Sequence, residues 1–273
     1  MQFALNYSPA AAELYRRGAV HIDLFKCPDW PDLVQDAQAV CPAYVHFPLV
    51  TGAGLLEAVD WRAVDQLLAA TDTPFINVHL RALPVDVPGV SDPPDKAGAA
   101  RLIERMSADL RFLARRYGAE RVIVENYPYG KRREDCMALA VDPDVFHILL
   151  DQSGCGLLLD LSHARISARS LGLDERDYIA RFPLDRLREL HVTGIQPVNG
   201  VPTDHMPFTE ADWEMFDWFV GLIRDGQAPQ PQIVACEYGG ISDKFSWRTD
   251  PAVIAEQIPR MVEALRALPE RGG

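Results

Sequence analysis

The sequence has no long apolar segment. No run of apolar residues approaches the ~20 that a transmembrane helix needs, although 48% of the 273 residues are hydrophobic. The first residues, MQFALNYSP, contain no basic stretch followed by an apolar one and so do not resemble a signal peptide. We therefore expect a cytoplasmic protein without contact to a membrane.

Cysteine is scarce as well. The five cysteines are an odd number, are widely spaced and form no Cys-x-x-Cys motif. A disulfide framework and a cysteine-based zinc site are therefore both disfavoured.

Positive charge is also in short supply. The chain has 27 Lys and Arg against 39 Asp and Glu, which gives a net charge of −12 at pH 7. Binding to nucleic acid or to an anionic membrane surface needs clustered Lys and Arg. Neither is therefore expected as a partner.

Short apolar runs alternate with longer amphipathic ones along the whole chain. The short runs are rich in Val, Ile and Leu, as buried parallel strands are, and eight β–α units fit the length. We predict an α/β protein with a single domain over residues 1–273, a (β/α)8 TIM barrel of the xylose-isomerase-like type. A doubly wound open sheet is the alternative, but no Gly-x-Gly-x-x-Gly or P-loop motif follows a strand. The expected strands are 2–6, 20–25, 43–49, 75–80, 121–125, 156–160, 189–192 and 232–237, and the expected helices are 9–17, 30–39, 60–70, 95–117, 142–153, 174–181, 209–224 and 250–268, with a turn near 162–170.

Ionisable side chains recur where these strands end, which is where TIM barrels carry their chemistry. Five of the seven histidines and four carboxylates lie there, although buried charges are costly unless they are paired or bound to metal. Imidazole and carboxylate together suit Zn, Mn and non-haem Fe, and nine ligands exceed what one ion can use, which suggests two or three ions. The nine candidates are His46, His79, Glu125, Asp160, His163, His191, Asp204, His205 and Glu237.

Several ordered segments resemble one enzyme family over nearly the whole chain. They include AYVHFPLVTGAG, VIVENYPYG, the run from GCGLLLDLSHAR to LRELHVTGI, TDHMPFTEADW and ACEYGG. The chain is similar to the multinuclear non-haem iron-dependent oxidative enzymes, TIM barrels that include the methanobactin-biosynthesis oxidase and the β-carbon-excising enzyme of 3-thiaglutamate biosynthesis. Of these two enzymes, we expect the chain to be more similar to the second.

The resemblance implies an O2-dependent oxidoreductase that holds two or three iron ions and modifies a cysteine of a ribosomally made precursor peptide. β-Carbon excision from a C-terminal cysteine is our first interpretation, and oxazolone or thioamide formation is the second. A small partner protein that binds the leader peptide is also implied. The ligands carried over are His46, His79, Glu125, Asp160, His191, His205 and Glu237, with His46, Glu125, Asp160 and His191 in catalytic roles.

Two positions depart from the family pattern. His163 stands where the family often has Asn, and Asp204 directly precedes His205 where the family tends to have Asp-x-His. An imidazole at position 163 could strengthen a metal site or shift its occupancy. We keep both His163 and Asp204 as candidate ligands, and the adjacency sets Asp204 one residue out of register with the family pattern.

Further residues near the rim are candidates for binding substrate. Tyr127 and Tyr129 follow the strand that ends at Glu125, and Arg132 in a short basic cluster could meet a peptide carboxylate. Asn126 adjoins Glu125, and Asp23 lies near the end of the second expected strand.

Two other functions stay open. The same order of His, Glu and Asp residues is similar to the endonuclease IV and xylose-isomerase-like barrels, where zinc or another divalent ion would support phosphodiester hydrolysis or sugar isomerisation or epimerisation. The acidic charge disfavours DNA but not a sugar. The third hypothesis is a non-catalytic barrel that binds a leader peptide or stores metal.

Overall fold

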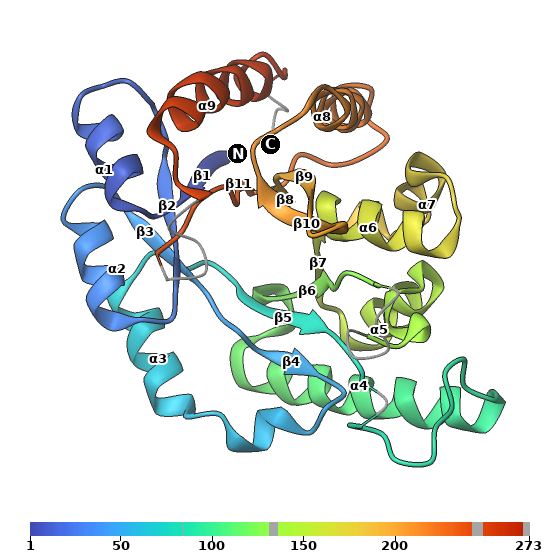
Figure 1. Cartoon of the computed structure of the whole chain (residues 1–273). Helices are drawn as coiled ribbons and strands as arrows, with labels where there is room; N and C mark the ends of the chain where they lie inside the picture. The colour runs from blue at the N-terminus through green and yellow to red at the C-terminus, as the bar shows by residue number, and fades with distance from the viewer. Residues whose placement is uncertain (84, 131–135, 242–247, 270–273) are drawn as a thin grey trace.

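The computed structural model describes residues 1–83, 85–130, 136–241 and 248–269. Nine parallel strands form one curled sheet in the order β3-β2-β1-β11-β8-β7-β6-β5-β4 (Figure 1). The first strand pairs with the last, because β1 lies between β2 and β11. The strands are β1 Gln2–Asn6, β2 Leu24–Pro28, β3 Ala43–His46, β4 Val50–Thr51, β5 Ile76–Leu80, β6 Val122–Asn126, β7 Gly156–Asp160, β8 Leu187–Val192 and β11 Ile233–Cys236.

The third strand position of the barrel is split. β3 pairs with β2 and β4 pairs with β5, while residues 47–49 between them belong to no strand, although Leu49 O accepts from His79 N at 2.8 Å. The side chain of Asn77 on β5 closes this gap: its Oδ1 accepts from Phe47 N at 2.7 Å and its Nδ2 donates to Phe47 O at 2.9 Å. The sheet therefore forms the eight-position barrel that the sequence predicts.

Helices surround the sheet (Figure 1). Apolar residues between sheet and helices form the main core, and two smaller apolar clusters lie elsewhere, one around Tyr44 and Ala235 and one of Phe75, Ile123 and Leu158. The helices are α1 Pro9–Arg16, α2 Pro31–Gln38, α3 Trp61–Ala70, α4 Lys96–Tyr117, α5 Pro143–Ser153, α6 Leu161–Leu171, α7 Glu175–Ala180, α8 Glu210–Arg224 and α9 Pro251–Arg266, with 3-10 turns η1 Leu55–Ala58, η2 Ala119–Arg121, η3 Ala138–Val141 and η4 Leu184–Arg186. No helix in the described part of the chain is both long and apolar enough to cross a bilayer.

The structure corrects the second strand. It begins at Leu24 and ends at Pro28, whereas the apolar run predicts residues 20–25. Backbone pairing decides the register, because Ala4 faces Leu24 and Asn6 faces Lys26. A buried lysine and a terminal proline have low strand propensity, so apolar patterning alone ends the strand too early.

Two further elements go beyond the prediction. Residues 161–171 form the full helix α6 rather than a turn, since the Asp160 side chain caps its first turn by accepting from His163 N at 2.7 Å. After β8 the chain forms an antiparallel hairpin of β9 Gly194–Val198 and β10 Val201–Met206. This hairpin carries Asp204 and His205, which sequence reasoning places in a loop.

Candidate metal centre

Strand alternation explains why polar groups gather in one layer. Side chains two residues apart on a strand share a face, and five strands carry an apolar residue of the two smaller clusters followed two positions later by an ionisable one. These pairs are Leu24 and Lys26, Tyr44 and His46, Ile123 and Glu125, Leu158 and Asp160, and Ala235 and Glu237. The apolar residues thus lie below the polar layer, toward the beginnings of the strands.

Strand register sets the polar groups at the same height. His79 is the direct partner of Glu125 on neighbouring strands, and Asp160 is the direct partner of His191. Glu237 continues the ladder just beyond β11, since its backbone N donates to Val192 O at 3.0 Å. The carboxyl ends of adjacent parallel strands therefore present these side chains to one another, as the sequence predicts.

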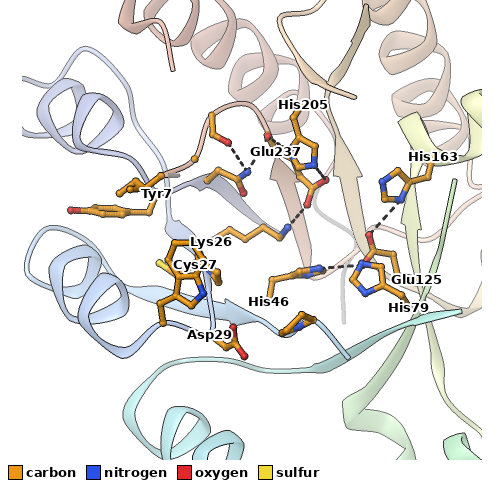
Figure 2. Close-up of a pocket in the computed structure, with 17 residues that line it drawn as sticks. Tyr7, Lys26, Cys27, Asp29, His46, His79, Glu125, His163, His205 and Glu237 are labelled. Carbon is orange, nitrogen blue, oxygen red and sulfur yellow. Dashed lines mark hydrogen bonds and ion pairs between the residues drawn. The ribbon is translucent and has the colours of Figure 1, made fainter. Parts of the chain in front are cut away.

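Glu125 lies at the centre of four imidazoles. Its Oε2 is 3.3 Å from His46 Nε2 and 3.1 Å from His79 Nε2. Its Oε1 is 3.6 Å from His191 Nδ1 and 3.7 Å from His163 Nδ1. Only 1% of Glu125 is exposed, and Oε2 has no hydrogen-bond partner despite these neighbours. Figure 2 shows Glu125 beside His79, with the ring of His46 pointing toward them.

Three groups of side chains bring ligand atoms within 4.8 Å of one another. Asp160 Oδ2 and His191 Nδ1 are buried without a hydrogen-bond partner, as Glu125 Oε2 is. Buried polar atoms without partners are rare, and an ion between them would satisfy them. Any two of these groups have one residue in common, so the shared residue could bridge two ions. The groups are His46–Glu125–His191, Glu125–Asp160–His163 and Asp160–His191–Glu237.

Hydrogen bonds on the outer side fix the orientation of three histidines. His79 Nδ1 faces Leu49 O at 3.1 Å, and His205 Nδ1 faces Glu237 O at 2.7 Å. His191 Nε2 faces Glu189 Oε1 at 2.9 Å. Because each of these oxygens accepts, the outer nitrogen donates, and the inner nitrogen is the one that faces the cluster. This is how proteins orient histidine ligands of metals, so the donor set fits a metal centre.

His163 differs from the other histidines, because both of its ring nitrogens face oxygen acceptors. Nδ1 is 2.9 Å from Asn126 O, and Nε2 is 2.9 Å from Asp204 Oδ2. Burial alone would lower the pKa of His163, but Asp160 and then Asp204 raise it well above the usual value. In the metal-free protein, His163 therefore donates from both nitrogens.

The other pKa shifts follow from burial and from close charges. Burial raises the pKa of Asp160 to about 7. Burial, followed by the charge of Lys26, lowers the pKa of His46 well below its usual value. Burial opposes ionisation of Asp204, but the nearby His205 and His163 lower its pKa to about 2. The protonation of these imidazole and carboxylate groups therefore depends on burial and on the charges of their neighbours.

Lys26 and Glu189 are polar neighbours that the sequence analysis missed. Lys26 on β2 is 6% exposed and forms an ion pair with Glu237 Oε1. Glu189 accepts from Tyr44 Oη at 2.7 Å as well as from His191. Lys26 lies beyond Phe25, where apolar patterning ends the second strand. Glu189 lies at the start of its expected strand, whereas ligands are expected near the ends of strands. Strand alternation is the signal that finds both, since Lys26 lies two residues after Leu24 and Glu189 two before His191.

A cavity of about 470 Å³ opens over the cluster (Figure 2). Polar residues of the candidate centre form one part of its wall, and apolar side chains form another. The polar part includes His46, His79, Glu125, His163, His205 and Glu237, and the apolar part includes Tyr7, Cys27, Pro28, Trp30, Pro48 and Ile241.

The predicted substrate-binding residues are only partly near this cavity. Asp23 precedes β2 and accepts from Phe3 N at 2.7 Å, so its expected place at the end of the strand is wrong. Asn126 is 1% exposed and uses both ends of its amide on the backbone of Asp160. Its amide therefore links β6 to β7, and its role in binding substrate stays a prediction.

The remaining predicted substrate residues lie after β6. The ring of Tyr127 is 5.9 Å from that of His79 and 6.1 Å from that of His163, so it borders the cluster. Tyr129 packs against the core and donates its backbone N to Ser167 Oγ. Arg132 lies outside the described residues.

The barrel and its buried layer of histidines and carboxylates define a xylose-isomerase-like TIM barrel with a candidate metal centre. Solved structures agree on the fold. A D-psicose 3-epimerase with D-fructose superposes with a TM-score of 0.56 at 15% identity, over 98% of this chain and 99% of that one. A fusion of a xylose isomerase-like TIM barrel with a 4-hydroxyphenylpyruvate dioxygenase gives 0.55 at 16% identity, over 100% of this chain and 45% of that one.

Sequence comparison finds the same family over part of the chain. Residues 101–227 match the family model of the RiPP precursor modification enzymes MbnB/TglH/ChrH, which confirms over that segment the resemblance that the motifs indicate. The segment contains six of the nine ligand candidates: Glu125, Asp160, His163, His191, Asp204 and His205.

Curated proteins also match part of the chain. A UPF0276 protein of Bordetella parapertussis is 30% identical over 34% of this chain and 38% of its own length. Another from Acaryochloris marina is 26% identical over 54% of this chain and 46% of its own length. The match thus spans less than half the length of either relative.

Proposed function

We propose that the protein is an iron-dependent oxidoreductase that uses O2 to modify a cysteine of a ribosomally made precursor peptide. The observation that carries the proposal is the ring of three ligand groups in which Glu125, Asp160 and His191 are each shared. Shared ligands suit a centre of two or three ions rather than one. The family match supports a precursor peptide as the substrate class.

Iron bound in this layer would supply the transfer of electrons from the substrate cysteine to O2. The residues of the chain position and shield that chemistry. Glu189, Leu49 O and Glu237 O fix the rings of His191, His79 and His205 by accepting their outer N–H groups. The ligands are thus held before the ions bind, which lowers the cost of assembling the centre.

The apolar part of the cavity is suited to a peptide. Trp30 is 48% exposed and lies at the cavity with Tyr7 and Ile241. These side chains would cover the residues next to the substrate cysteine and keep water from the polar layer. The sequence-based interpretation, β-carbon excision from a C-terminal cysteine with oxazolone or thioamide formation second, stays a prediction, as does a leader-binding partner protein.

The test begins with anaerobic loading of the protein with Fe(II) and analysis of bound metal. A peptide that ends in cysteine is then added with O2, and O2 uptake is recorded while fragmentation mass spectra locate any change. The matched control is the same peptide ending in serine. We expect a mass change confined to the cysteine. A chain that binds no iron, or that binds iron but never consumes O2 with cysteine peptides, contradicts the proposal.

A sugar epimerase or a related metal-dependent hydrolase is the second candidate. It is favoured by the likeness to D-psicose 3-epimerase and D-tagatose 3-epimerase-like structures, a likeness that extends to the fold alone. Zn or Mn would replace iron in this case. Loading with Mn(II) and following ketohexose epimerisation by chromatography tests it, and epimerisation without O2 uptake would favour this candidate over the oxidase.

A further inference from the structure

Lys26 places a permanent positive charge inside the candidate metal centre. It projects from β2 into the cavity, and its ammonium group forms an ion pair with Glu237 Oε1 (Figure 2). Both side chains are buried, at 6% and 5% exposure. A buried ammonium is costly without a partner, so the pair with Glu237 holds it in place.

The same carboxylate oxygen belongs to one of the three ligand groups. Glu237 Oε1 is 3.1 Å from His191 Nδ1, and these two residues form a group with Asp160. A divalent ion in that group would share its oxygen with the ammonium of Lys26 and would be repelled by it. The other two groups, centred on Glu125, do not use Glu237.

The formal charge of the layer also disfavours a third ion. Among the described side chains that form ion pairs with the candidate histidines or with Glu237, five are carboxylates and one is the ammonium of Lys26, which leaves four negative charges when the histidines are neutral. Two divalent ions match that charge, whereas a third would leave an excess of positive charge in a buried site. The five carboxylates are Glu125, Asp160, Glu189, Asp204 and Glu237.

We propose that Lys26 is a built-in cation that takes the place of a third metal ion, so that this centre holds two ions around Glu125. The proposal rests on the metal centre described under the proposed function. It assigns Lys26 a positioning role, because Lys26 acts through Glu237 and contacts none of the other candidate ligands by an ion pair among the described residues.

Native mass spectrometry of the whole chain after anaerobic Fe(II) loading counts the ions directly. We expect two for the wild-type protein. Lys26→Met removes the charge while keeping a long side chain, and we expect a third ion to bind. Lys26→Arg keeps the charge and is the matched control, for which two ions are expected. Adding Glu237→Gln to Lys26→Met should return the count to two.

The outcomes separate this inference from the proposed function. A wild-type chain that binds no ions contradicts the metal centre itself. A wild-type chain that binds three ions overturns the role of Lys26 and leaves the centre standing, and this result needs no variant. Two ions in both the wild type and a folded Lys26→Met variant, with equal dissociation constants by calorimetry, also overturn it. Circular dichroism verifies that each variant is folded.

Discussion

Glu125→Gln is the sharpest test of the candidate centre, because this side chain lies within 3.7 Å of four imidazole nitrogens and belongs to two ligand groups. The substitution keeps the shape of the side chain and removes its charge. Loss of a residue that merely supports a metal ligand already weakens metal binding about 10–100-fold. We therefore expect at least the upper end of that range for Glu125→Gln.

The loss of metal affinity can be measured as a smaller metal-induced rise in Tm. An ion present at about 100 times its dissociation constant stabilises the folded chain by roughly 2.7 kcal/mol. For a domain of this size, each kcal/mol moves Tm by about 2–4 °C, so the wild-type protein should gain roughly 5–11 °C for each such ion. A variant with about 100-fold weaker binding gains only about 0.4 kcal/mol at the same concentration. Its Tm should therefore rise by no more than about 2 °C.

The assay is differential scanning calorimetry with Fe(II) under anaerobic conditions, repeated with Mn(II). Each variant is compared with its own metal-free form, so that any change in intrinsic stability cancels. Glu104→Gln is the matched control, since Glu104 is an exposed residue paired with Arg111 far from the candidate ligands. If Glu125→Gln keeps the full metal-induced rise in Tm, Glu125 is not a ligand and the reasoning fails.

Three further predictions test the surroundings of the centre. Because burial raises the pKa of Asp160 to about 7, its carboxyl group holds a proton below that pH in the metal-free protein. Metal affinity should therefore fall from pH 8 to pH 6, and metal binding should release a proton. Calorimetry in buffers of different ionisation enthalpy should detect this release, whereas a metal affinity that does not change with pH contradicts the prediction. Glu189→Gln should weaken metal binding about 10–100-fold without removing a ligand, because Glu189 orients His191; an unchanged dissociation constant would refute that role. Asn126→Ala removes both hydrogen bonds to the backbone of Asp160, so urea unfolding of the metal-free chain should show a loss of about 1–3 kcal/mol, and an equal midpoint would count against it.

Much of the fold is predictable from the sequence because parallel strands buried on both faces read as short apolar runs. Strands β1, β5, β6 and β7 lie within a residue or so of their expected bounds for that reason. β2 was misplaced because its inner face carries Lys26, which apolar patterning treats as the end of a strand. α6 was reduced to a turn because Asp160 is both the last residue of β7 and the cap of the helix, which leaves no loop between them.

The candidate ligands are predicted from ionisable residues near or just after the ends of the strands, and the same rule explains what it misses. A barrel stacks side chains in layers, so the residues below the ligands on the inner face must be polar where they hold a ligand in place. Glu189 under His191 and Asn77, whose Nδ2 is 3.1 Å from His46 Nε2, occupy that lower layer, whereas Lys26 lies in the layer of the ligands. None of the three ends a strand, yet each contacts a ring or carboxylate of the ligand layer. Glu189 and Asn77 each lie two residues before a candidate ligand on the same strand, and Lys26 lies two residues before the end of β2. Substitutions in this lower layer should therefore change metal binding without changing the set of ligands.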